Sequence, residues 1–108
     1  MLDIYPVCLD VAQDAIVAAR VIGEHDAGLA DQLKRAGTSV PLNVAEGAYS
    51  KGGNRRSRYH NAMGSAGEAK AVFDIAERAG WIARDAARHA RLSRIIGTLV
   101  RVLKLGRR

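Results

Sequence analysis

An apolar stripe that contains a proline constrains this chain more than any other feature of its sequence. The stripe recurs every three or four residues, the spacing of one helix face, and comprises Leu29, Leu33, Ala36, Val40 and Val44. Pro41 lies inside it. Proline in a helix removes a backbone donor and costs about 3 kcal/mol. We therefore predict one long helix here, kinked near Pro41.

A second apolar set lies on the opposite side of the same predicted helix and comprises Leu42, Ala45 and Tyr49. A helix that is apolar on two sides must be buried on both sides. Because a small bundle covers only one of them, the other is available to a second subunit. The sequence therefore predicts a homo-oligomer with these three residues at the interface.

Four helices are predicted, at about residues 3–22, 26–49, 54–79 and 83–105, from apolar periodicity and helix-ending glycines. Asn54 is the predicted N-cap of the third helix. Inside that helix, Gly64 and Gly67 each cost about 1 kcal/mol relative to alanine, so we expect a neighbouring helix to approach them closely. Short connections favour one all-α domain over residues 1–108, an antiparallel up-down-up-down four-helix bundle.

The composition narrows the class of protein further. A chain of 108 residues can build one core, but it is too short for a deep catalytic cleft with a separate lid. Cys8 is the single cysteine, which rules out a disulfide within the chain and agrees with a cytoplasmic location. The sequence has neither the pattern of a signal peptide nor an apolar run long enough to cross a membrane.

The formal net charge of +6 conceals an asymmetry between the two halves of the chain. Residues 1–54 carry four basic and seven acidic residues, a net charge of −3, and residues 55–108 carry thirteen basic and four acidic residues, a net charge of +9. Such a dipolar subunit can pair with copies of itself or present its basic half to a polyanion.

Basic residues gather in two places. On one face of the predicted fourth helix they lack an acidic residue four positions away, and they comprise Arg91, Arg94, Arg101, Lys104 and Arg108. In the segment 50–58, around a predicted helix start whose backbone N–H groups attract phosphate, they comprise Lys51, Arg55, Arg56 and Arg58. Both groups predict salt-sensitive, sequence-independent binding to RNA or DNA. The alternatives are a solvated helix face and an ordinary exposed loop.

A polar set on the second and third helices comprises Asn43, Glu46, Ser65 and Glu68. We expect these side chains to meet across the bundle, where they would satisfy one another and the carbonyl that Pro41 leaves free. Acid–base chemistry by Glu46 and Glu68 is the weaker interpretation, because no nucleophile or glycine-rich substrate loop accompanies them.

Metal and cofactor binding find little support in the sequence. The histidines His25, His60 and His89 are scattered and do not have the spacing of a di-iron or zinc motif. The aromatic residues do not alternate with basic ones, as they would in a platform that stacks bases. We therefore predict no metal site and no cofactor.

Three stretches together resemble one known family: QLKRAGTSVPLNVAEG (32–47), SKGGNRRSRY (50–59) and GSAGEAKAVFDIAERAGWI (64–82). The family is that of four-helix bundle proteins encoded in ribosomal RNA intervening sequences, which includes accessory proteins of diversity-generating retroelements. The resemblance implies a ring-like homopentamer with a positively charged surface and a reverse transcriptase partner. Met63 departs from the pattern, because the resemblance places a basic residue there.

The sequence is thus best interpreted as a non-enzymatic, cytoplasmic, oligomeric bundle that binds nucleic acid through a basic surface. A structural or protein-interaction module with an acidic protein partner is the second interpretation. An enzyme that uses Glu46 and Glu68 is the third.

Overall fold

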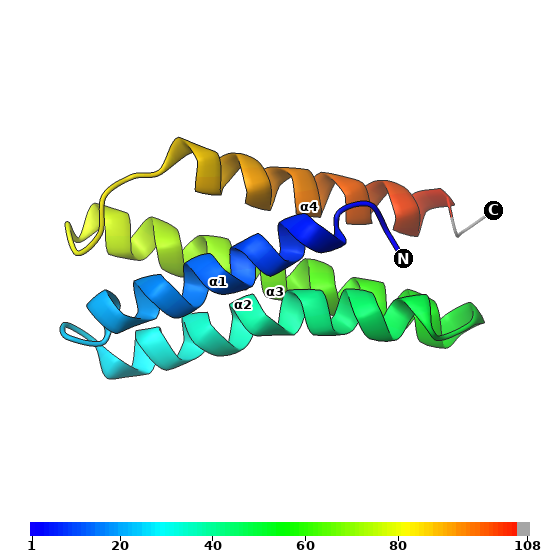
Figure 1. The fold of residues 1–108 in the computed structure, drawn as a ribbon, viewed down its shortest axis with the longest axis horizontal. Coiled ribbons are helices and arrows are strands. Elements are labelled where there is room, and N and C mark those ends of the chain that lie inside the picture. Colours follow the sequence, from blue (N-terminus) through cyan, green and yellow to red (C-terminus); the bar gives the residue numbers. More distant parts are fainter. Residues whose placement is uncertain (106–108) are drawn as a thin grey trace.

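A computed structural model describes residues 1–105 and contains four α-helices and, within these residues, no β-strand. The helices are α1 (Tyr5–Ile22), α2 (Ala27–Ala48), α3 (Gly52–Arg78) and α4 (Ala86–Leu105). The chain reverses at each short connection, so that successive helices run in alternating directions in Figure 1. Each helix packs against two neighbours, α1 and α3 both lying against α2 and α4. The predicted all-α four-helix bundle is confirmed.

Local signals set most of the helix ends. Asp26 caps α2, its carboxylate accepting a hydrogen bond from the backbone N–H of Leu29 at 3.0 Å. The third helix begins at Gly52, and its N-cap is Lys51, so the predicted cap at Asn54 is wrong. Gly52 has a φ of 57°, which lets the chain turn within very few residues and start the helix earlier than expected.

The core consists of small and medium aliphatic side chains with two aromatic rings, those of Phe73 and Tyr59. Its largest fully buried members are Phe73, Ile4, Ile22, Leu33, Leu92, Ile95, Leu99, Val11, Val40, Val44 and Cys8. Pro41 is also buried, and α2 continues through it as one helix. The predicted apolar stripe therefore faces the core, while the kink near Pro41 stays a prediction.

Glycines permit close helix packing on α2 and not on α3. A Cβ atom at Gly37 would overlap with the side chain of Ala15, and one at Gly47 would overlap with the ring of Tyr59. By contrast, a Cβ atom at Gly64 or Gly67 would have no neighbour within 4 Å. The expected close approach at these two glycines is therefore wrong within the subunit, because both lie on the exposed side of α3.

None of the helices between residues 1 and 105 combines the length and the apolar character that a membrane span requires.

Candidate functional site

The start of α4 is fixed to the end of α3 by a nearly buried arginine. Arg88 is 8% exposed, and its guanidinium lies 4.5 Å from the centre of the Phe73 ring. Its Nη2 donates to Glu77 Oε2 at 2.5 Å and to the carbonyl oxygen of Ala83 at 3.2 Å. Because both charges are largely removed from water, loss of Glu77 would leave Arg88 with only the carboxylate of Asp85, 4.0 Å away.

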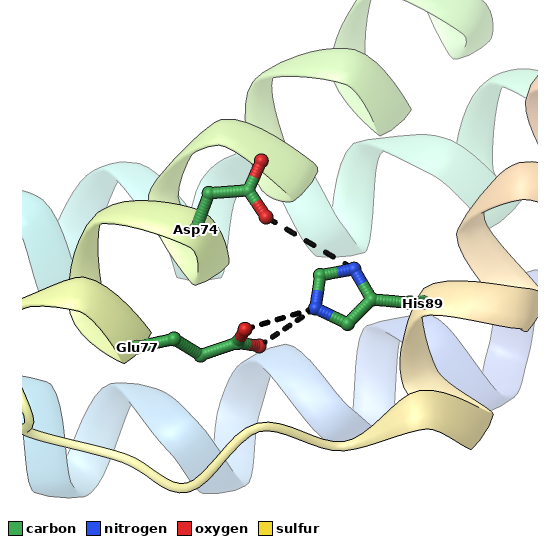
Figure 2. A group of neighbouring side chains, drawn as sticks. All are labelled: Asp74, Glu77 and His89. Atoms are coloured by element: carbon green, nitrogen blue, oxygen red, sulfur yellow. Dashed lines mark hydrogen bonds and ion pairs between the residues drawn. The ribbon is translucent and has the colours of Figure 1, made fainter.

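His89 joins the same cluster between α3 and α4, as Figure 2 shows. Its Nε2 lies 2.9 Å from each carboxylate oxygen of Glu77, and its Nδ1 lies 4.0 Å from Oδ1 of Asp74. Burial acts to raise the pKa of Glu77, but hydrogen bonds from His89 and Arg88 outweigh it and hold this pKa below its ordinary value. Lys70 pairs with the other oxygen of Asp74 at 2.9 Å.

Asp74, Glu77 and His89 offer ligand atoms within 4.8 Å of one another, so they are the residues that could approach a metal ion. One ion can bind only one nitrogen of the ring, however, and the two carboxylates face different nitrogens. Arg88 and Lys70 also occupy one oxygen of each carboxylate. The arrangement therefore fits an ion-pair clamp between two helices better than a metal site.

The sequence analysis missed this clamp. The available signal was the spacing of Asp74 and Glu77, three residues apart on one helix face, followed after a short connection by Arg88 and His89. Only the register of α3 against α4 shows that these side chains meet.

Arg91 does not belong to a free basic stripe. Its guanidinium donates from Nε and Nη2 to Oδ2 of Asp14 on α1, at 3.1 and 2.7 Å. The hydrogen bonds that Arg91 donates to Asp14 raise the pKa of Arg91, although burial acts in the opposite direction. Because Asp14 is 77 residues away in sequence, the absence of an acidic residue four positions from Arg91 did not reveal the pair.

Two of the basic residues in the segment 50–58 bind helix ends within the subunit. Arg55 Nε donates to the carbonyl oxygen of Gly47 in the last turn of α2, at 3.1 Å, and to that of Ser50 just after the helix, at 2.9 Å. Arg56 Nη1 donates to the carbonyl oxygen of Leu103 in α4 at 2.7 Å. Carbonyl groups at a helix C-terminus carry partial negative charge, so these arginines stabilise the ends of α2 and α4.

The other two residues of this segment differ from each other. Arg58 forms an ion pair with Glu46 at 2.9 Å, and both side chains are partly exposed. Lys51 is exposed and precedes α3, whose first turn receives no hydrogen bond from a side chain of its N-cap. Most of the segment is helix rather than the exposed loop that was the alternative, and its use as a phosphate site stays a prediction.

On α4, the basic residues that remain on the surface are Arg94, Arg101 and Lys104. None of the three forms an ion pair with another of residues 1–105. Arg101 donates only to the hydroxyl of Thr98 on its own helix, at 3.3 Å. Arg108 of the predicted stripe lies outside the described residues.

The predicted polar set does not form one cluster. Ser39 is the centre of one group: the Asn43 amide donates to its carbonyl and hydroxyl oxygens at 3.0 and 2.8 Å, and the Ser65 hydroxyl donates to it at 2.9 Å. Glu68 instead accepts a hydrogen bond from Gln32 at 3.0 Å, and Glu46 pairs with Arg58.

The expectation that these four residues satisfy one another is therefore wrong, and Asn43 serves the carbonyl of Ser39 rather than the one four residues before Pro41. The two glutamates belong to separate interactions, so the structure does not pair them for acid–base chemistry. Ser39 was not predicted, because it stands beside the apolar stripe, next to Val40, where a serine resembles an ordinary helix residue.

The predicted interface residues lie where a partner can reach them. Leu42 is 62% exposed and Tyr49 is 87% exposed, while Ala45 is half-buried between them. A second exposed apolar face, which the sequence analysis did not identify, runs along α1 and comprises Leu9, Ile16, Val17 and Val21. Its spacing follows a helix face, but the adjacent stripe of core residues on α1 obscured it.

Comparison with known proteins gave two matches. A family model described as "23S rRNA-intervening sequence protein" matches residues 1–103. A solved structure of a protein of unknown function from the S23 ribosomal protein family of Bacteroides thetaiotaomicron is similar, with a TM-score of 0.85. It is 17% identical in sequence, over 94% of this chain and 98% of that one, so the similarity concerns the fold. No curated protein matches this chain.

Proposed function

This chain belongs to the 23S rRNA-intervening sequence protein family, and we propose that it is a non-enzymatic bundle that self-associates and binds nucleic acid non-specifically. The observation that carries the proposal is the exposed face of α4, where Arg94, Arg101 and Lys104 have no acidic partner among the described residues. Cations without protein partners are available to phosphate groups, and each phosphate contact releases counterions.

Lys51 extends this basic surface to the start of α3. The first-turn N–H groups of α3 lack a side-chain cap, and a helix N-terminus favours negative charge. Arg55, Arg56 and Arg58 remain part of the proposed surface. Because they form bonds within the subunit, they should contribute less to nucleic-acid affinity than the sequence predicted. Contacts of this kind reach the backbone of the nucleic acid and not its base sequence.

Self-association is the second part of the proposal. The exposure of Leu42 and Tyr49 supports an interface on α2, and the apolar face of α1 offers a complementary surface of the same character. We also propose that the oligomer is the homopentamer and that its partner is the reverse transcriptase that the resemblance implies. The proposed location is cytoplasmic. Repetition of the basic face around an oligomer would raise the affinity far above that of one subunit.

The test of binding is a salt titration with duplex and single-stranded nucleic acid. We expect affinity to fall steeply with salt, and the double variant Arg94→Glu and Arg101→Glu to bind all sequences more weakly. The control variant, Arg20→Glu with Arg35→Glu, changes the net charge of the protein by the same amount, but on α1 and α2 instead of α4. It should retain most of the affinity for nucleic acid. If the unmodified protein retains no nucleic acid at low salt, the alternative of an acidic protein partner takes first place.

The test of self-association is light scattering at tens of micromolar. Leu42→Glu with Tyr49→Glu should give smaller species with unchanged helicity, whereas a monomeric unmodified protein would contradict the interface.

A further inference from the structure

Two neighbouring grooves lie where the start of α3 meets the end of α4. The larger, of about 450 Å³, is lined by Gly52, Gly53, Arg55, Arg56, Tyr59, Val102 and Leu103. The smaller, of about 210 Å³, is lined by Arg56, His60, Met63, Val100, Leu103 and Lys104. Both grooves are lined by Arg56 and Leu103, which are joined by a hydrogen bond of 2.7 Å.

The walls of these grooves combine two kinds of chemistry. Tyr59 and Leu103 are buried in the core, and Val102 is half-buried beside them, which provides an apolar surface. Lys104 and His60 are exposed at the rim and form no ion pair with another described residue. A ligand that fits both features must carry negative charge and flat or apolar groups at a short spacing.

We propose that these grooves hold unpaired bases of a single-stranded nucleic acid, while its phosphates contact Lys104 at the rim. This inference rests on the proposed binding of nucleic acid and specifies which form is preferred. In a duplex the base faces are stacked on one another, so only an unpaired base can place its face on an apolar surface. The larger groove has more volume than one base occupies, and Arg56 lies where a backbone would pass from one groove to the next.

Glycine at position 53 offers a way to close the larger groove without changing any charge. Gly53 lines this groove, and a Cβ atom there would have no neighbour within 4 Å, so Gly53→Leu adds a bulky side chain at the groove without a clash. Gly64 lies in the same helix with equally open surroundings and outside both grooves, which makes Gly64→Leu the matched control. Both substitutions replace a helical glycine and should leave the fold intact, which thermal melts would verify.

The experiment compares three fluorescent ligands of equal phosphate number at one salt concentration: a single strand, an abasic strand and a duplex. The unmodified protein should bind the single strand about fivefold more tightly than the abasic strand, the effect of removing roughly 40 Å² of apolar surface from water when one base covers the groove wall. Gly53→Leu should remove most of this preference and leave affinity for the abasic strand unchanged, and Gly64→Leu should retain the preference.

The outcomes separate the two proposals. Equal affinity for the single strand and the abasic strand, or an unchanged preference in Gly53→Leu, overturns the inference but leaves non-specific binding standing. Failure to bind any of the three ligands at low salt overturns both.

Discussion

Arg91 on α4 donates two hydrogen bonds to one carboxylate oxygen of Asp14 on α1, at 3.1 and 2.7 Å. Among neighbouring helices, α1 and α4 pack together least extensively. The ion pair between Arg91 and Asp14 therefore stabilises the weakest helix contact of the bundle, the seam between α1 and α4. The pair also divides the basic residues of α4 by role. Arg91 is committed to the fold, and Arg94, one turn later, faces solvent.

The first prediction concerns this division. Arg91→Gln should lower the free energy of unfolding by about 1–2 kcal/mol, because it removes charge-assisted hydrogen bonds at a partly exposed site. Arg94→Gln should change it by less than about 0.5 kcal/mol. Urea unfolding of both variants measures the difference. Equal effects on stability would show that the Asp14 pair does not hold the seam.

The second prediction concerns Glu77 and pH. The folded-state pKa of Glu77 lies below its ordinary value of 4.5, so its ionised form stabilises the fold above that value. This contribution is lost as the pH falls through the folded-state pKa. Glu77→Gln leaves the buried Arg88 with only the more distant Asp85, 4.0 Å away, and should cost about 3 kcal/mol at neutral pH.

Thermal melts from neutral to acidic pH test this behaviour. The unmodified protein should lose stability on acidification more steeply than Glu77→Gln, so that the gap between them narrows. A gap that stays constant at every pH would contradict the role of the Glu77 carboxylate.

The third prediction uses two kinds of glycine. Gly37→Ala should destabilise the protein, because its methyl group would overlap with Ala15 and force α1 and α2 apart. Gly64→Ala and Gly67→Ala should each stabilise the subunit by about 0.5–1 kcal/mol, because both positions are helical and open. Denaturant melts distinguish the two cases. Destabilisation by Gly64→Ala would indicate that another subunit covers that face of α3.

The fourth prediction concerns the single cysteine. Cys8 is fully buried, and burial raises the pKa of its thiol to about 12, against a smaller opposing effect of a backbone hydrogen bond. A thiol that is neutral and inaccessible should not react with a disulfide reagent at neutral pH until the protein unfolds. Rapid, stoichiometric labelling of the native protein would show that α1 opens readily.

Much of the fold could be predicted because it depends on residues close together in sequence. The stripe of Leu33, Val40 and Val44 follows a helix period, and all three are fully buried. The start of α3 was misplaced because a glycine with positive φ allows a tighter turn than composition suggests. In the candidate site, Arg94, Arg101 and Lys104 are exposed, as their positions on the polar face of the predicted fourth helix indicated.

The sequence by itself determined the four helices, the apolar side of each and the excess of positive charge in the second half. Tertiary structure alone decided which charges remain available, because the partners of Arg91, Arg56 and His89 lie on other helices. An ion pair between helices depends on the register and rotation of the helices. These follow from how closely small residues such as Gly37 and Ala15 pack. The charge on each helix face can therefore be read from the sequence of that helix. Whether a charged side chain is paired or exposed depends on how two helices pack.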